Sequence, residues 1–350
     1  MKLALINDIH IGVRNDSPVF LDAHEKFFTN IFLPRLVLDK IDTVIILGDL
    51  FDRRKYCSFN SLYRVKKFLF DKLAEMGVTV HILVGNHDVT YKNTNRVNSP
   101  ELLLAEYDNV HVYTEPTILD IYEPICLMPW INLENEELSM EFLQEFNGDL
   151  VFGHFEINGF EMHHNGGECY DGLEPVNFKR FEHVFSGHFH EPSWKGNIQY
   201  LGAPMQFTWA DYDCSRGFSI WDFTTREITK VENPDKMFHK LFYDDNTLDQ
   251  EIDWDALKNR VVRVHVKEKN DQHKFDLFVD KLQRSSPYQL DIVDNTGYTI
   301  DDEFDESLVK NEDTMDLVSK YIDSLDIPYD QNKIKDLFRD LYIEALAELD

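Results

Sequence analysis

Short β-branched runs alternate with longer amphipathic segments through the first two thirds of the chain. Five runs are short and apolar enough to be buried sheet strands, and these are Lys2–Ile6, Thr43–Leu47, Val78–Val84, Asp149–Phe152 and His183–Phe185. Two helix-length segments separate the first three: Phe20–Asp39, which we expect to bend at Pro34, and Asn60–Met76. Ser58 is the expected N-cap of the second helix, and Gly77 is its expected stop. The pattern predicts a βαβαβ unit.

Later strands follow without long helices between them, which is typical of the second half of a layered sandwich. They are Gln199–Leu201, Gly217–Phe223 and Glu227–Val231. The pattern changes around Asn233. A strand at Val261–Val266, a helix at Lys274–Arg284 and a strand at Tyr288–Val293 then predict a small βαβ unit of their own.

The end of the chain has a third pattern. A charge run at Asp301–Asp305 indicates a linker. Beyond it, apolar residues recur at steps of three and four, as they do on one face of a helix. They are Met315, Val318, Ile322 and Leu325, and then Ile334, Leu337, Phe338, Leu341, Tyr342, Ala345, Leu346 and Leu349. The predicted division is 1–235 for a main domain, 236–298 for a small second domain, 299–312 for an acidic linker and 313–350 for C-terminal helices.

Composition narrows the class of protein. The chain has 350 residues, which is roughly two domains at about 100 to 200 residues each, and 43% of its residues are hydrophobic. Wholesale disorder is therefore excluded. Lys and Arg total 35 against 64 Asp and Glu, a net charge of −29, which disfavours a simple cationic surface for nucleic acid or anionic membrane. From Asp291 to Asp350 there are 18 acidic and 5 basic residues, so this end is a distinct acidic segment.

The apolar stretches and the cysteines of the sequence limit the compartment and the kind of metal site that can be expected. No apolar stretch approaches the about 20 residues of a membrane span, and the start of the chain lacks the pattern of a signal peptide. We therefore expect a cytoplasmic protein without a membrane partner. The four cysteines, at positions 57, 126, 169 and 214, form no CxxC pair, which disfavours a zinc ribbon and a disulfide scaffold. Any metal chemistry must use His, Asp and Asn side chains.

Five short polar motifs come directly after the five predicted buried strands. They are Asp8-Ile9-His10, Gly48-Asp49-Leu50-Phe51-Asp52, Gly85-Asn86-His87-Asp88, Gly153-His154 and Gly187-His188-Phe189-His190. In open α/β sheets ligands bind at the carboxyl ends of strands, so these motifs should converge on one site. Taken singly, each could be an ordinary turn. In this order and position they predict a functional site.

The residue types suit two divalent metal ions. A carboxylate such as Asp49 can bridge two ions about 3.5 to 4 Å apart, while imidazoles and an amide oxygen complete each coordination sphere without adding charge. Mixed nitrogen and oxygen ligands suit manganese, iron or zinc better than magnesium or calcium, which prefer oxygen.

The ordered set of motifs resembles the calcineurin-like metallophosphoesterase superfamily across residues 1 to about 230. Within it, the second motif, Ser186-Gly187-His188-Phe189-His190 and the small second domain are similar to SbcD-type DNA repair exonucleases, which pair with an SMC-like ATPase. Tyr91-Lys92-Asn93 and Gly172-Leu173-Glu174-Pro175 resemble the nuclease subunits of T-even-type phage recombination endonucleases. The resemblance implies a four-layer αββα sandwich with a small α+β capping domain and C-terminal helices.

The resemblance also implies the ligands of two metals. One metal would be held by Asp8, His10, Asp49 and His190, and the other by Asp49, Asn86, His154 and His188. Manganese is the metal that the family implies, with magnesium as a weaker substitute. His87 would be a catalytic histidine that is not a ligand, and Asp88 would orient its ring. Asp52 stands where some relatives have a second histidine, so its role stays open.

Cations beside the motifs favour DNA as the substrate despite the net negative charge. They are Arg53, Arg54, Lys55, Lys92 and Arg96. The alternative is that they belong to solvated loops.

The sequence contains no Gly-x-x-x-x-Gly-Lys-Ser/Thr loop, so it has no visible ATP site. The resemblance implies that an SMC-like ABC-type ATPase supplies this activity and is bound by the C-terminal helices. The residues expected to bind it are Met315, Val318, Ile322, Ile334, Leu337, Phe338, Leu341, Tyr342 and Leu346. The alternative is that this apolar face packs on its own domain.

The family also implies an oligomer and a compartment. A homodimer would form through Phe59–Phe70 and Pro100–Ala105, giving a heterotetramer with the ATPase. It would act in the bacterial cytoplasm, or in the infected host cell if the protein is phage-encoded.

The leading hypothesis is a two-metal DNA nuclease subunit of an ATP-regulated recombination and double-strand-break repair complex. It would act as an exonuclease on duplex ends from the 3′ side and as an endonuclease on single strands. The rival is a stand-alone metallophosphatase or phosphodiesterase of the same superfamily. Asp52-Arg53, after Gly48-Asp49, also resembles a motif of protein phosphatases. Such phosphatases typically carry Glu where this chain has Asp88, and they need no cap. An assembly factor with a degenerate site ranks last because every expected metal position is filled.

Overall fold

The computed structural model describes residues 1–161, 167–247 and 252–294, together with Ile322 and Lys335. The chain divides into two compact units, Met1–Gly297 and Tyr298–Asp350. The elements described below belong to the first unit. The expected linker 299–312, and all of the apolar C-terminal positions named above except Ile322, lie outside the described residues.

The first of two six-stranded sheets has the order β12-β11-β1-β2-β3-β4. Strands β1 to β4 are parallel, and β11 is antiparallel to both β1 and β12. The strands are β1 (Lys2–Ile6), β2 (Thr43–Leu47), β3 (Thr79–Leu83), β4 (Val110–Tyr113), β11 (Gly217–Asp222) and β12 (Glu227–Glu232).

The second sheet has the order β5-β6-β7-β8-β10-β9. Its four inner strands are parallel, and the edge strands β5 and β9 are antiparallel to their neighbours. The strands are β5 (Thr117–Ile121), β6 (Glu123–Met128), β7 (Leu150–His154), β8 (His183–Gly187), β9 (Ser193–Lys195) and β10 (Ile198–Tyr200).

Alternation along the buried strands builds two cores at once, because successive side chains of a strand point to opposite faces. Leu3 and Leu5 of β1 pack between the two sheets in one cluster with Phe152 of β7. Ala4 and Ile6 pack in a second cluster with the side chains of the covering helices. A strand that is covered on both faces has a continuous run of apolar residues. The sequence predicted these strands because such runs are easily recognised.

Both long helices of the predicted βαβαβ unit contain a π-helical turn. The first consists of α2 (Pro18–Phe27), η1 (Phe28–Phe32) and α3 (Leu33–Asp39). Pro34 has no N–H to donate to the preceding turn, and the widened turn lies just before it, where a bend was expected. The second helix consists of α4 (Phe59–Val65), η2 (Lys66–Phe70) and α5 (Asp71–Glu75), and it ends at Gly77, whose φ is +69°.

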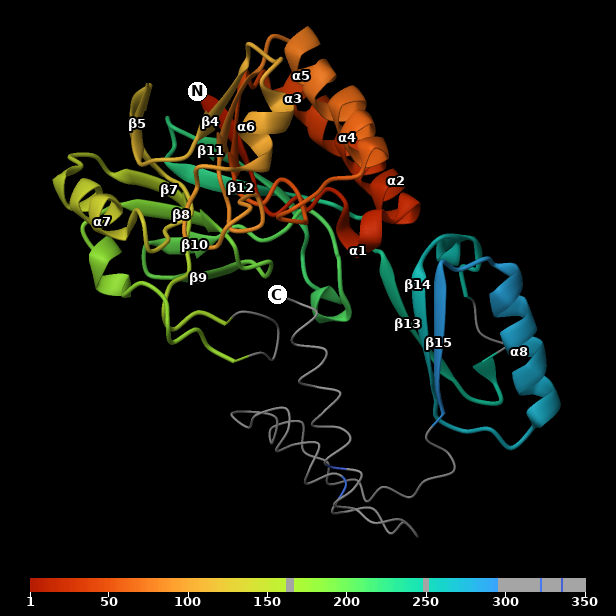
Figure 1. Ribbon diagram of the computed structural model, residues 1–350. Coiled ribbons are helices and arrows are strands. Elements are labelled where there is room, and N and C mark those ends of the chain that lie inside the picture. The colour runs from red at the N-terminus through yellow and green to blue at the C-terminus, as the bar shows by residue number, and fades with distance from the viewer. Residues whose placement is uncertain (162–166, 248–251, 295–321, 323–334, 336–350) are drawn as a thin grey trace. The chain divides into compact units, whose positions relative to one another are not determined.

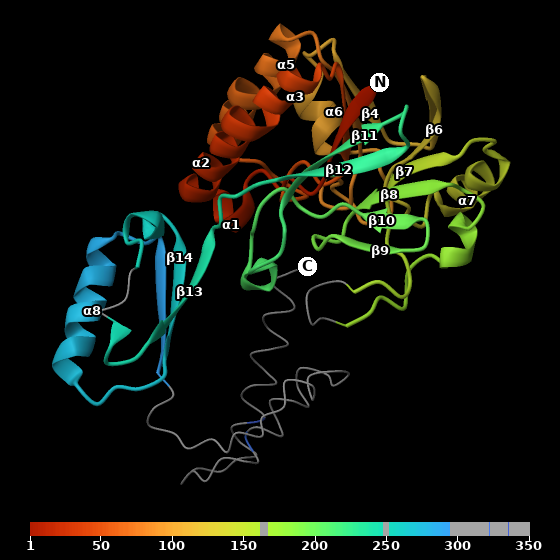
Figure 2. The same ribbon diagram turned by 180° about the vertical axis from the view of Figure 1, so that it is seen from behind.

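Helices α2 to α5 cover the outer face of the first sheet, and α7 (Glu136–Glu145) covers the outer face of the second (Figures 1 and 2). The predicted four-layer αββα sandwich is therefore confirmed. Its shorter helices are α1 (Val13–Asp16), α6 (Ser99–Leu104), η3 (Pro175–Phe178) and η4 (Trp209–Asp211). The short helix η6 (Asp255–Leu257) lies beyond it, between β13 and β14.

A third, three-stranded parallel sheet follows the sandwich in the chain. Its order is β13-β14-β15, with β13 (Phe238–Tyr243), β14 (Val261–Val266) and β15 (Gln289–Asp294). The helix α8 (Gln272–Arg284) packs on one face, where Val262 and Val264 lie in one cluster with Phe278 and Leu282. The predicted βαβ unit corresponds to β14, α8 and β15. Strand β13 is an addition that the sequence did not predict.

Candidate metal centre

The five polar motifs lie at the carboxyl ends of strands from both sheets, and the structure brings them together. Among the described residues, three groups have ligand atoms within 4.8 Å of one another. They are Asp8, His10 and His190; Asp49, His154 and His188; and His10, Asp52 and His87. All seven residues expected to hold metal, Asn86 included, therefore lie around one centre.

The motifs contain glycines because side chains of neighbouring motifs lie very close to the backbone at these positions. A Cβ atom at Gly85 would collide with the Asp49 carboxylate, and one at Gly48 would collide with the His154 ring. Gly48 also has a φ of +88°, a conformation that favours glycine. The glycines thus allow the second, third and fourth motifs to meet.

Four of the converging residues hold the left-handed backbone conformation without being glycine. Asp8 and His10 have φ of 50°, Asp49 has φ of 54° and His188 has φ of 87°. Such conformations cost free energy and persist where the surrounding structure fixes them, often at functional sites. This strain directs the four side chains toward a common point.

In the first group, two imidazole nitrogens face each other. His10 Nε2 lies 3.0 Å from His190 Nε2 and 3.8 Å from Asp49 Oδ2. Both carboxylate oxygens of Asp8 accept the backbone N–H of His188 at 3.1 Å, which fixes the carboxylate beside them.

In the second group, acceptor atoms face one another. His154 Nδ1 lies 2.7 Å from the Leu47 carbonyl oxygen, so its N–H donates there and Nε2 faces the centre. This Nε2 lies 2.9 Å from Asn86 Oδ1 and 3.4 Å from Asp49 Oδ2. His188 Nδ1 lies 3.0 Å from the same Asn86 oxygen. Acceptors this close repel one another unless positive charge, from a proton or a metal ion, lies among them.

The pKa values of two of the four histidines expected to hold metal are raised, and those of His188 and His190 are lowered. Burial opposes protonation of His154, but the adjacent Asp49 carboxylate outweighs it and raises the pKa of His154 to about 9. Burial likewise opposes charge on His10, yet Asp52, Asp49 and Asp8 raise its pKa to about 8. Burial and the charge of His154 lower the pKa of His188 to about 3, which leaves its nitrogen free to coordinate. These donors fit two divalent ions that share Asp49.

The Asp88 carboxylate makes different contacts from those expected, whereas His87 lies at the centre. His87 Nδ1 lies 2.7 Å from the Asp52 carbonyl oxygen, and this contact orients the ring. The Asp88 carboxylate instead accepts the backbone N–H groups of Leu50, Phe51 and Gly85, at 3.0 to 3.3 Å. Burial and the charge of Asp49 raise the pKa of Asp88 to about 7. The expectation that Asp88 orients the His87 ring is therefore corrected: Asp88 joins the loops of the second and third motifs.

Asp52, whose role the sequence left open, lies against two histidines. Its Oδ1 is 3.3 Å from His10 Nδ1, and its carbonyl oxygen is the partner of His87 Nδ1. A carboxylate behind a ligating histidine fixes the tautomer and the orientation of the ring.

The five cations expected to bind DNA have different surroundings. Lys92 lines a cavity beside His154. The Nη1 atom of Arg54 is buried without a hydrogen-bond partner, and burial lowers the pKa of Arg54 although Asp49 opposes the shift. Arg96 pairs with Glu134, Arg53 lies 4.9 Å from the Tyr56 ring, and Lys55 is exposed. Lys92 and Arg54 are thus the two that the described contacts associate with the centre.

Three residues outside the motifs lie against the histidines. Arg216 donates to the His190 carbonyl oxygen. The ring of Phe207 lies 5.5 Å from His10 and 5.7 Å from His190, and that of Trp130 lies 5.2 Å from His188. None belongs to a motif, so only the folded structure associates them with the site.

A sandwich of this kind, with carboxylates, an amide and imidazoles at the carboxyl ends of strands from both sheets, defines a metal-dependent phosphoester hydrolase. The chain belongs to the calcineurin-like phosphoesterase family, whose model matches residues 1–192. This confirms the family that the motifs predicted.

Two curated relatives extend the similarity beyond the matched domain. The chain is 30% identical over 353 residues to exonuclease subunit 1 of Enterobacteria phage T4, covering 99% of each chain. It is 22% identical over 275 residues to a subunit of the nuclease SbcCD from Staphylococcus saprophyticus, covering 69% of this chain and 70% of that one. Among solved structures, purple acid phosphatase PPD1 of yellow lupin matches with a TM-score of 0.40 and 13% identity, covering 66% of this chain and 52% of the phosphatase.

None of the helices in the described part of the chain has the length and hydropathy that a membrane span requires.

Proposed function

We propose that this protein is a two-metal DNA nuclease, the catalytic subunit of an ATP-regulated recombination and double-strand-break repair complex. It would degrade duplex ends from the 3′ side and cut single strands internally. The observation that carries the proposal is a pair of adjacent donor groups. Asp49 belongs to one of them, and its carboxylate lies 3.8 Å from His10 of the other. Two relatives, an exonuclease subunit and a nuclease subunit, support a nucleic acid as the substrate.

In this proposal the first ion is held by Asp8, His10, Asp49 and His190, and the second by Asp49, Asn86, His154 and His188. Bound divalent ions supply charge neutralisation for the phosphate and activate water at neutral pH. Manganese suits the mixed nitrogen and oxygen donors better than magnesium does.

His87 is the proposed general acid. The contact of its Nδ1 with the Asp52 carbonyl oxygen makes Nδ1 the donor, so Nε2 is the atom that exchanges a proton with the leaving oxygen. The side chain is half-buried, which leaves it accessible to substrate. A positioned acid of this kind contributes about 10² to 10⁴ to the rate.

The small second domain is proposed to bind the DNA backbone through the sheet face opposite α8. In the register of this sheet, Lys240 pairs with Arg263, and Phe242 pairs with His265. Lys267 lies 4.5 Å from the Phe242 ring, and Arg263 lies 4.2 Å from the Trp209 ring. Cations interleaved with aromatic rings suit nucleic acid. Arg263 also pairs with Asp291, whose oxygen lies 3.4 Å away, which leaves Lys240 and Lys267 as the proposed contacts with the phosphates. The boundaries 1–235 and 236–298 remain the proposed domain limits.

Partner binding is proposed on two surfaces. Phe59 and Tyr63 of α4 are 89% and 63% exposed, and Leu102 of α6 is 69% exposed. Exposed apolar side chains of this size favour an interface, which supports a homodimer. The C-terminal segment 313–350 is proposed to bind the SMC-like ATPase, since both relatives are named as subunits.

Substrate preference tests the proposal against the rival phosphatase. With manganese, the purified protein should cut linear duplex and single-stranded DNA and should leave phosphomonoesters almost untouched. Efficient hydrolysis of phosphoprotein or p-nitrophenyl phosphate, with intact DNA, would favour the phosphatase instead.

A further inference from the structure

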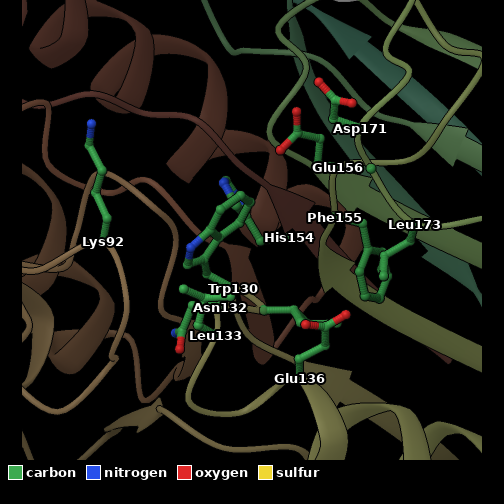
Figure 3. Close-up of a pocket in the computed structure, with 12 residues that line it drawn as sticks. Lys92, Trp130, Asn132, Leu133, Glu136, His154, Phe155, Glu156, Asp171 and Leu173 are labelled. Carbon is green, nitrogen blue, oxygen red and sulfur yellow. The ribbon is translucent and has the colours of Figure 1, made fainter.

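A cavity of about 290 Å³ opens directly beside the metal centre. Its lining includes Lys92, Trp130, Asn132, His154, Glu156 and Asp171. Figure 3 shows Glu156 and Asp171 on one side, Lys92 on the opposite side, and Trp130 and His154 between them. Because His154 also contacts Asn86 and Asp49 in the centre, whatever fills the cavity lies next to the reacting phosphate.

Trp130 is a rigid aromatic surface in this cavity. Its backbone N–H donates to the Val84 carbonyl oxygen at 2.8 Å. Its own carbonyl oxygen accepts the side-chain N–H groups of Asn95 and Asn135, at 2.8 and 3.0 Å. The ring lies 5.2 Å from His188 at an interplanar angle of 39°. Because the backbone is held by hydrogen bonds and the ring lies against His188 and His154, the indole is placed before a ligand arrives, which lowers the entropy cost of stacking.

The charges around the cavity exclude a phosphate and accept a neutral ring. Glu136, Glu156 and Asp171 contribute three carboxylates against the single ammonium of Lys92. A phosphodiester would be repelled by this excess of negative charge. A nucleobase is uncharged and presents a flat face to an indole. Adenine, cytosine and guanine also carry amino groups that donate to carboxylates.

We propose that this cavity holds the base of the nucleotide at the cleaved bond, stacked on Trp130, with its amino group directed to Glu156 or Asp171. The inference rests on the proposed nuclease function and deepens it. The bound base then fixes the position of its own phosphate over the centre. Lys92 lies on the side of the cavity opposite Glu156 and Asp171.

The test compares a single-stranded deoxyadenosine oligomer with an oligomer of the same length built from abasic units, both with manganese. Loss of a base–aromatic stack lowers kcat/KM by about 5- to 150-fold. Wild type should lose this factor when the bases are removed. Trp130→Leu should lose it on the adenosine oligomer, so that its adenosine rate divided by its abasic rate falls to about one. Trp130→Phe should recover most of the loss.

The matched control is Trp194→Leu on β9, because Trp194 is 74% exposed; this variant should match wild type on both oligomers. Equal losses on both oligomers by Trp130→Leu would overturn the inference, since Trp130 would then act through the histidines. Wild-type rates for this variant on the adenosine oligomer would also overturn it. If Trp130→Leu does not fold, an unchanged preference for bases in Trp130→Ala decides against stacking. Wild type that cuts neither oligomer contradicts the nuclease function itself.

Discussion

Asp52 contacts two histidines at the edge of the centre. Its side-chain carboxylate lies 3.3 Å from His10 Nδ1, and its backbone carbonyl oxygen binds His87. Asp52→Ala removes only the first contact. Because supporting carboxylates typically change metal affinity by about 10- to 100-fold, manganese affinity measured by calorimetric titration should fall by that factor. Asp120→Ala, at an exposed position of β5, is the control. Unchanged affinity in Asp52→Ala would show that His10 needs no such support.

Proton transfer and metal binding should separate at His87. His87→Asn should keep the metal, because the proposed ligand sets do not include His87, and should lower the cleavage rate by about 10² to 10⁴. His188→Ala should lose metal and activity together. Elemental analysis beside the rate measurement distinguishes the two cases, with His111→Asn on β4 as the control. A His87→Asn protein that purifies without metal would mean that His87 is a ligand.

Strand β12, at the edge of the first sheet, carries a lysine that should make stability depend on pH. The Lys230 ammonium donates to the Leu201 carbonyl oxygen, and burial together with Arg216 lowers its pKa to about 7. Folding therefore disfavours the charged form: the destabilisation is fully present below pH 7 and disappears as pH rises toward the unfolded value of about 10.4.

Lys230→Met removes this effect. The variant should have a higher Tm than wild type at pH 7, and the difference should shrink between pH 7 and pH 9.5, by at most about 1.4 kcal/mol per pH unit in unfolding free energy. Thermal unfolding at the two pH values measures it. A constant difference would show that Lys230 stays protonated in the folded protein.

The first three strands that the sequence predicted are buried on both faces, whereas several elements that it missed are partly exposed. Strands β1, β2 and β3 are covered on both faces, so their apolar runs were sufficient. Edge strand β5 alternates in exposure, and β13 mixes lysine and histidine with aromatic residues, so neither forms an apolar run. Helix α7 is rich in glutamate and buries only Ser139 and Leu143. Short patterns of this kind acquire their structure from neighbours that are remote in sequence.

The features of the site also fall into those that the sequence predicted and those that it did not. The ligand positions follow predicted strands, and the direction of a parallel strand fixes the sheet edge at which its motif lies. The contacts of Asp52, Asp88, Arg216 and Trp130 could not be predicted, because each joins loops that meet only after the sheets have packed. Asp88 illustrates this: its position beside His87 in sequence suggested a contact with the ring, whereas its carboxylate binds three backbone amides instead.

At the scale of the whole molecule, the proposed roles of the catalytic unit and the C-terminal segment can be separated by truncation. Deleting Asp313–Asp350 should leave a protein that folds and cuts a short single-stranded substrate, while binding to the ATPase and any ATP-dependent change in activity should be lost. If the segment instead packed on the catalytic domain, its removal would lower stability by several kcal/mol at about 0.8 kcal/mol per buried CH₂. A truncated protein that melts much lower, loses cleavage and still binds the ATPase would contradict the assignment.

The shared metal centre is tested most directly by measuring manganese content and DNA cleavage in the same samples of wild type and Asp49→Ala. We predict about two manganese ions per wild-type chain, as a centre with one bridging carboxylate requires. Cleavage should be much faster with manganese than with magnesium and should be abolished by a chelator. Asp49→Ala should lose both metal and activity. Full cleavage in magnesium alone, or an Asp49→Ala protein that keeps its metal and its activity, would contradict the account.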